Sequence, residues 1–172
     1  TVVEITDQDN VDIADIATKS SVPVVSSSDF VSKTVVQCSR YLGYSAVYAE
    51  LFSFGNNNIV LHSVKGYENK YFGEVAQAFK NSILLGVSWV EEKNGVERRT
   101  AVLNPEPDYE LFDDEELIIL TSQEGPEISS LPTTEIEPLM DVAPYERPVF
   151  NRVLILGWNA SIIDILREFD GH

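Results

Sequence analysis

Cysteine and histidine are scarce in this sequence of 172 residues, which contains one cysteine, Cys38, and two histidines, His62 and His172. A single cysteine cannot form an internal disulfide, which fits a reducing compartment or a chain that needs no bridge. No cluster of cysteine and histidine has the spacing of a zinc site. Because Cys38 has no histidine near it in sequence and His62 lies in a predicted strand, no catalytic triad can be assembled, and we expect no enzymatic activity.

Long apolar runs are also absent. No stretch reaches the roughly 18 residues that cross a bilayer, and residues 1–25 lack the basic start and small-residue cleavage site of a signal peptide. The composition, with 44% hydrophobic and 10% aromatic residues, is ordinary for a packed globular core. We therefore expect the given chain to fold and to be soluble.

Positive charge is the third shortage. The chain has 12 basic and 28 acidic residues, a formal net charge of −16, which argues against binding to nucleic acid or to an anionic membrane surface. The imbalance is greatest between Thr100 and Glu146, where 13 acidic residues stand without any lysine or arginine. This segment either stays solvated or binds cations.

The first part of the chain alternates between strand and helix periodicity. Strands are predicted over residues 1–7 and 22–28, and helices over 7–17, 29–43 and 44–52. A strand, helix and strand in this order predict a parallel pair with a helical crossover. Ser28 or Asp29 is expected to cap the helix that begins at residue 29, and Gly43 to end it.

The pattern changes after Phe54 to that of a small α+β unit of about 70 residues. Strands are predicted over residues 56–64, 82–90, 100–105 and 117–122, with a short helix over 71–79. Residues 91–99 are predicted to form a hairpin turn around Asn94-Gly95, and residues 106–116 an acidic turn. Five prolines between residues 124 and 150 predict an extended linker.

The chain closes on the beginning of a dinucleotide-binding fold. An apolar run from Val153 to Leu156 predicts a strand that leads into Gly157. Apolar residues then recur at the spacing of one helix face, at Ile162, Ile165, Leu166 and Phe169. Such a fold normally needs on the order of 100 residues more.

Four stretches together resemble a known family: TVVEITDQDN, VVQCSRYLGYSAVYAELFSF, AVLNPEPDYELFDDEELIILTSQE and RVLILGWNASIIDIL. In order and spacing they are similar to the regulatory RCK (TrkA-like) region of the Castor and Pollux ion channels and their bacterial relatives. In such channels a transmembrane pore precedes two RCK units in tandem. Each unit has a Rossmann-like lobe, a crossover helix pair and a small C-terminal lobe.

The resemblance implies a fold that is α/β plus α+β, and a chain that is a fragment of a longer membrane protein. Residues 1–27 would be the end of a Rossmann-like lobe, and residues 28–52 a crossover helix pair. Residues 53–125 would form an RCK C-terminal lobe. A linker over residues 126–150 would then lead to the start of a second Rossmann-like lobe over residues 151–172.

The helix pair is the predicted dimer interface. Its apolar residues exceed what one thin sheet covers, and two-helix hairpins of this kind commonly pack against a copy of themselves. The alternative is ordinary packing within the chain. The interface prediction names Phe30, Val35, Cys38, Leu42, Val47 and Leu51. The resemblance implies a homodimer within a tetrameric gating ring, coupled to the pore domain of the same polypeptide.

The acidic turn is the candidate metal site. Ca²⁺ prefers several oxygen ligands close in space, and carboxylates lie at Asp108, Glu110, Asp113 and Asp114, followed by Glu115 and Glu116. The spacing is not that of an EF-hand loop, and Asp113 stands where related small lobes carry a glycine. A solvated acidic hairpin is the alternative.

Two further positions are candidates for ligand binding. Asp7, Asp9 and Asn10 follow the first predicted strand, where ligands tend to bind, although a plain helix cap also explains Asp9 or Asn10. The turn at Gly157 lacks the G-x-G-x-x-G spacing, and Asn159 and Ala160 replace the arginines that the family places after Gly-Trp. We expect this turn to be structural, and the cofactor stays unknown.

Together with the resemblance, these observations predict a non-catalytic, ligand-sensing gating domain of a K⁺ or Ca²⁺ channel. The resemblance implies a position on the cytoplasmic side of a bacterial inner membrane, or at the nuclear envelope as in the plant members of the family. One alternative is a nucleotide-responsive regulatory subunit of a potassium uptake system. Another is a fragment of an NAD-dependent oxidoreductase.

Overall fold

The computed structural model describes residues 2–6, 10–18, 22–53, 55, 57–93, 96–122, 125–129, 152–159 and 161–170. Within these residues the fold mixes α-helices and β-strands. The chain divides into two compact units: the first comprises residues 1–46 with 138–172, and the second comprises residues 47–137. No helix in the described ranges has the length and apolar character needed to cross a membrane.

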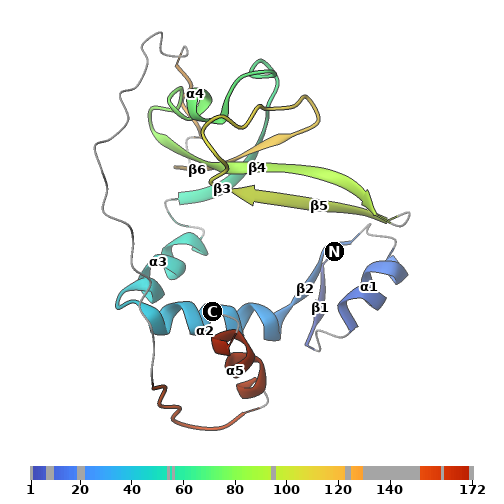
Figure 1. Ribbon diagram of the computed structural model, residues 1–172, viewed down its shortest axis with the longest axis vertical. Helices are drawn as coiled ribbons and strands as arrows, with labels where there is room; N and C mark the ends of the chain where they lie inside the picture. Colours follow the sequence, from blue (N-terminus) through green and yellow to red (C-terminus); the bar gives the residue numbers. More distant parts are fainter. Residues whose placement is uncertain are drawn as a thin grey trace. The chain divides into compact units, whose positions relative to one another are not determined.

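The first unit is built on a short parallel sheet. Strand β1 (Val3–Ile5) pairs with β2 (Val24–Ser26), and helix α1 (Val11–Thr18) connects them. Helix α2 (Ser27–Arg40) continues directly from β2, and α5 (Ile162–Asp170) packs against α2 (Figure 1). The predicted order of strand, helix and parallel strand is therefore confirmed.

Helix α3 (Tyr44–Leu51) begins in the first unit and ends in the second. Gly43 lies between α2 and α3 with φ of 101°, a backbone conformation that side chains with a Cβ rarely adopt. The predicted interruption of the two helices at this glycine is confirmed.

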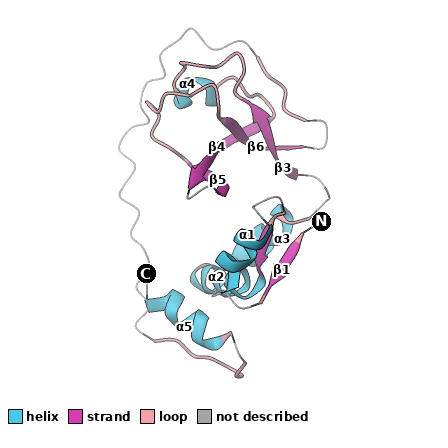
Figure 2. Cartoon of the chain, turned by 90° about the vertical axis from the view of Figure 1, so that its right-hand side faces the viewer, coloured by secondary structure: helices cyan, strands magenta, loops and turns pink. Residues whose placement is uncertain are grey.

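The second unit contains a four-stranded antiparallel sheet. Its strands are β3 (Asn57–Ser63), β4 (Ser82–Lys93), β5 (Val96–Leu103) and β6 (Glu116–Ser122), in the order β3-β6-β4-β5. Helix α4 (Phe72–Ala76) lies over one face of this sheet (Figure 2). The hydrophobic core fills the space between them and consists of Val64, Phe72, Val75, Phe79, Leu84, Val87, Leu111, Leu117 and Ile119.

Alternation along the strands explains this core. Leu117 and Ile119 are both fully buried, because residues two apart in a strand point to the same face. They pair with Val87 and Leu84 on the neighbouring strand β4. The register of β4 shifts between Leu84 and Gly86, so a bulge brings both of these β4 side chains to the same side as α4.

Two predictions about strand extents are wrong. Residues 91–93 and 96–99 are strand rather than turn, because β4 and β5 stay paired out to Lys93 and Val96. Val153–Leu156 forms no strand: none of the described strands pairs with it, and a strand requires a partner for its backbone N–H and C=O groups.

Part of the predicted linker belongs to the second unit. Residues 125–129 are hydrogen-bonded to residues 78–81, with Ile128 paired to Phe79 in antiparallel fashion. The remaining linker residues from 130 to 150 lie outside the described residues. So do the predicted hairpin turn at Asn94 and Gly95, and His172.

Candidate functional site

Helix α2 is fixed at its N-terminus by a serine cap. Ser26 has an extended backbone, and its Oγ accepts a hydrogen bond from the Asp29 backbone N–H at 3.4 Å. The prediction that Ser28 or Asp29 caps this helix is therefore wrong. Ser28 lies inside the helix, and its hydroxyl donates to the backbone oxygen of Thr6 at 2.6 Å. Ionic pairing of Lys33 with Asp29, at 2.9 Å, supports the first turns.

One side of α2 is buried and another is open. Val36 and Ser32 are buried, whereas Phe30, Val31 and Val35 are exposed. Val31 is not among the predicted interface residues, although its spacing of four from Val35 on a helix is the signal that would have found it. Within the described part of the chain, α2 thus buries only some of its apolar side chains.

The other predicted interface residues are also fully or partly exposed. Leu42 is fully exposed, Val47 is 55% exposed, and Leu51 and Cys38 are half-buried. No residue of α3 is buried. Tyr41 contacts Tyr44 and Tyr48 stacks on Phe52, so aromatic rings accompany both ends of this helix.

The acidic loop between β5 and β6 pairs with the segment around α4. The N–H groups of Phe72 and Gly73, at the start of α4, donate to the backbone oxygens of Tyr109 and Pro107 at 2.8 and 2.9 Å. The loop therefore satisfies N–H groups that a helix N-terminus otherwise leaves without partners. Leu111, fully buried, fixes the loop in the core.

Glu115 is the structural carboxylate of this loop. It is only 5% exposed, and it accepts hydrogen bonds from the Tyr109 hydroxyl and, at 3.0 Å, from the Phe112 backbone N–H. Burial, and then the hydrogen bond and negative charge of Glu115, raise the pKa of Tyr109 to about 12. The sequence pattern does not separate Glu115 from its acidic neighbours, because only the fold buries it.

The structure does not bring the predicted metal ligands together. Asp108, Glu110, Asp113 and Asp114 are all exposed. In the described part of the chain no three side chains of histidine, cysteine, aspartate or glutamate are grouped so that they could hold a metal ion. The Ca²⁺ site stays a prediction from the sequence.

The remaining candidate residues, for ligand binding or catalysis, lie in separate parts of the chain. Asp7 and Asp9 lie outside the described residues, whereas Asn10 immediately precedes α1. His62 lies in the edge strand β3 opposite Leu117. Cys38 is a free thiol on α2, in the first unit, whereas His62 belongs to the second.

The Gly157 turn lines a cavity of about 410 Å³ in the first unit. Gly157 has φ of 104°, and Asn159 Oδ1 accepts a hydrogen bond from the Ser161 N–H at 3.0 Å, just before α5. The cavity walls are mostly apolar and include Val35, Ile162 and Phe169. The turn thus lies directly before α5, and its purely structural role stays a prediction.

Comparison with known proteins identifies the family. The family model for Castor and Pollux, part of voltage-gated ion channel, matches residues 28–137, more than half of the chain. The chain therefore belongs to the Castor and Pollux family. The match includes α3, the whole described sheet of the second unit and nearly all of α2.

Two plant proteins are similar over nearly the full chain. Ion channel CASTOR of Lotus japonicus is 21% identical over 170 residues, which are 98% of this chain and 19% of that protein. Probable ion channel CASTOR of Oryza sativa subsp. japonica is 21% identical over 172 residues, covering 98% and 18% of the two chains. The chain spans about a fifth of the length of these relatives.

Proposed function

We propose that the chain is a non-catalytic, ligand-sensing gating module of a cation channel and that it acts as a pair of copies joined through α2 and α3. Membership of an ion-channel family supports the channel assignment over a potassium-uptake subunit or an oxidoreductase. The proposal includes the RCK lobe arrangement, a cytoplasmic position and coupling to a pore of the same polypeptide.

The exposed apolar side chains of α2 and α3 carry the pairing proposal. Val35 is 43% exposed and Val47 55%, and each lies on a helix inside the family match. Burying the open part of such a side chain contributes on the order of 1 kcal/mol. Exposed apolar side chains that gather on a helix commonly mark a protein interface.

Sedimentation equilibrium of the purified chain tests the pairing. We expect the wild type to dimerise, and Val35→Glu or Val47→Glu to raise the dimer Kd by at least about 100-fold, because a charge would be buried without a partner. Ile13→Glu is the control, since Ile13 is an exposed apolar residue on α1, outside the proposed interface. A monomeric wild type, or equal weakening by Ile13→Glu, would refute the interface.

Ligand sensing is tested separately by calorimetry. Titration of the chain with Ca²⁺, Mg²⁺, ATP and NADH should yield binding of one ion or small ligand without turnover. NADH binding accompanied by oxidation or reduction of a substrate would favour the oxidoreductase alternative. ATP binding alone would favour the nucleotide-responsive subunit.

A further inference from the structure

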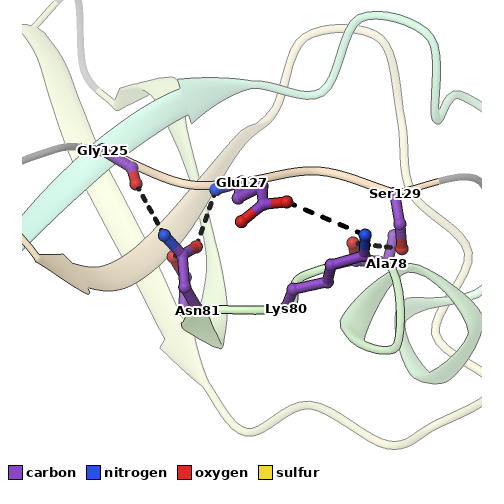
Figure 3. Close-up of polar contacts among 7 residues, drawn as sticks. Ala78, Lys80, Asn81, Gly125, Glu127 and Ser129 are labelled. Carbon is purple, nitrogen blue, oxygen red and sulfur yellow. Dashed lines mark hydrogen bonds and ion pairs between the residues drawn. The ribbon is translucent and has the colours of Figure 1, made fainter.

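Residues 125–129, which we call the strap, run beside residues 78–81, which we call the edge (Figure 3). The two segments are antiparallel, with Ile128 opposite Phe79. The edge lies between α4 and β4, and the strap follows β6 in the chain. Both segments belong to the second unit.

Backbone hydrogen bonds define the register of the strap. The Lys80 N–H donates to the Glu127 backbone oxygen at 3.1 Å, and the Ser129 N–H donates to the Ala78 oxygen at 2.7 Å. The Ser129 hydroxyl donates to that same Ala78 oxygen at 3.0 Å. The strap therefore supplies two donors to the carbonyl of a fully buried residue.

The Asn81 side chain adds a second attachment, in which its amide group forms hydrogen bonds with the strap backbone as a neighbouring strand would. Its Oδ1 accepts a hydrogen bond from the Glu127 backbone N–H at 2.7 Å, and its Nδ2 donates to the Gly125 oxygen at 3.4 Å. One amide group thus holds both a donor and an acceptor of the strap backbone (Figure 3). Ser82 donates to the same Oδ1 at 3.0 Å and helps to orient it.

Apolar burial accounts for only part of this attachment. Ile128 is 40% exposed. The ion pair between Lys80 and Glu127, at 3.7 Å, joins two side chains that are each more than half exposed, so it adds little stability. The contact has a defined register, and several of its polar groups can exchange their partners for water, which permits local opening.

The strap is also separate from the main strand ladder. The ladder between β4 and β6 ends at the pair Ser82 and Thr121. From there to the pair Phe79 and Ile128 the strap side is longer than the edge side, and Gly125 with φ of 85° lies in this interval. The strap can therefore open without breaking a hydrogen bond of the ladder.

From these contacts we propose that residues 125–129 are a detachable strap with two states. In the attached state residues 125–129 are hydrogen-bonded to the edge. In the detached state these hydrogen bonds are open and the edge, including the Ala78 carbonyl, is uncovered. This two-state element sets where the following part of the chain is anchored, and it does not depend on the proposed pairing of α2 and α3.

Residue-resolved amide hydrogen exchange on the full 172-residue chain tests the strap. In the wild type the Glu127 and Ser129 amides should exchange at least about 100-fold faster than the Ile119 amide of β6, because they open locally. Asn81→Ala should accelerate the Glu127 and Ser129 amides by a further factor of about 10, since two hydrogen bonds are lost. The rate at Ile119 should change less than about twofold.

Matched variants separate the two kinds of contact. Lys80→Ala removes only the exposed ion pair and should change the strap rates less than about threefold. Asn81→Asp keeps the acceptor for the Glu127 N–H and should lie between the wild type and Asn81→Ala. Strap and β6 amides exchanging at one rate in the wild type, or no acceleration in Asn81→Ala, would overturn the proposal.

A locked form provides an independent measurement if Asn81→Ala also weakens the fold. Positions 80 and 127 face each other across the antiparallel pair, at a separation that a disulfide usually spans. In a Cys38→Ser background, oxidised Lys80→Cys/Glu127→Cys should slow the Ser129 amide and leave Ile119 unchanged, and reductant should reverse the effect. Slowing of both amides would show a strap that opens only with the whole unit and would refute the two states.

Discussion

Gly86 is the position where the sheet of the second unit leaves no room for a side chain. A Cβ built on Gly86 would lie 2.0 Å from the Val102 backbone oxygen and 2.9 Å from the Leu103 Cα. Real Cβ atoms essentially never approach another heavy atom more closely than 3.0 Å, and both obstacles belong to the backbone of β5. Gly86→Ala must therefore push β4 and β5 apart.

The expected cost follows from that displacement. Forcing extra volume into a packed site costs about 1–3 kcal/mol. Strand separation also strains hydrogen bonds beside the bulge, such as the 2.7 Å bond from Asn104 N–H to the Leu85 oxygen, each worth about 1 kcal/mol. We expect Gly86→Ala to lower the free energy of unfolding of the second unit by about 3–5 kcal/mol, a large part of the roughly 5–15 kcal/mol of a typical domain.

Urea unfolding monitored by Trp89 fluorescence measures this cost, because Trp89 is half-buried in β4 against the core. Trp158 is mostly exposed and should change its emission little. Gly66→Ala is the control: Gly66 has φ of 96° and open space around it, so only backbone strain of about 1–2 kcal/mol is expected. A loss in Gly86→Ala no larger than in Gly66→Ala would refute the steric reasoning.

Two further predictions concern the acidic loop. Because burial and Glu115 raise the pKa of Tyr109 to about 12 from 10.0, this group stabilises the fold fully below pH 10, and its contribution is lost as pH rises from 10 towards 12. We expect the free energy of unfolding to fall by about 1 kcal/mol over this pH range, after allowance for partial solvent access. Urea unfolding measured at pH 10 to 12 should show this fall in the wild type but not in Tyr109→Phe. The same fall in both proteins would contradict the prediction. Glu115→Ala should lower the free energy of unfolding by about 2–3 kcal/mol in urea melts, since the Tyr109 hydroxyl and the Phe112 N–H lose a charged acceptor. The exposed neighbour Asp114→Ala should stay within about 0.5 kcal/mol, and equal losses in both variants would contradict a structural role for Glu115.

The strands and helices with strong periodic signals were predictable from local sequence. Residues 117–122 form β6 from its second residue to its end, and the apolar positions of residues 29–43 form most of α2. Both segments carry their own pattern of buried side chains, so no knowledge of distant partners was needed.

Features that depend on a distant partner could not be predicted in this way. The apolar run Val153–Leu156 has the composition of a strand but none of the described strands pairs with it. A turn signal at Asn94-Gly95 indicates a hairpin without saying how far its strands stay paired. Likewise, nothing local distinguishes the buried Glu115 from the exposed Asp114.

The distribution of charge limits what can hold two copies of the chain together. Each copy has a formal charge of −16, and the exposed carboxylates of the loop at Asp108 and Glu110 form no metal-holding group in the described residues. Two copies with this net charge repel each other at low ionic strength, where the repulsion between charges extends over about 10 Å or more before salt screens it. We therefore expect attraction in the proposed pair to come mainly from apolar contact through side chains such as Val35 and Val47. Salt should then strengthen the association, because it screens the repulsion and leaves the apolar contribution in place.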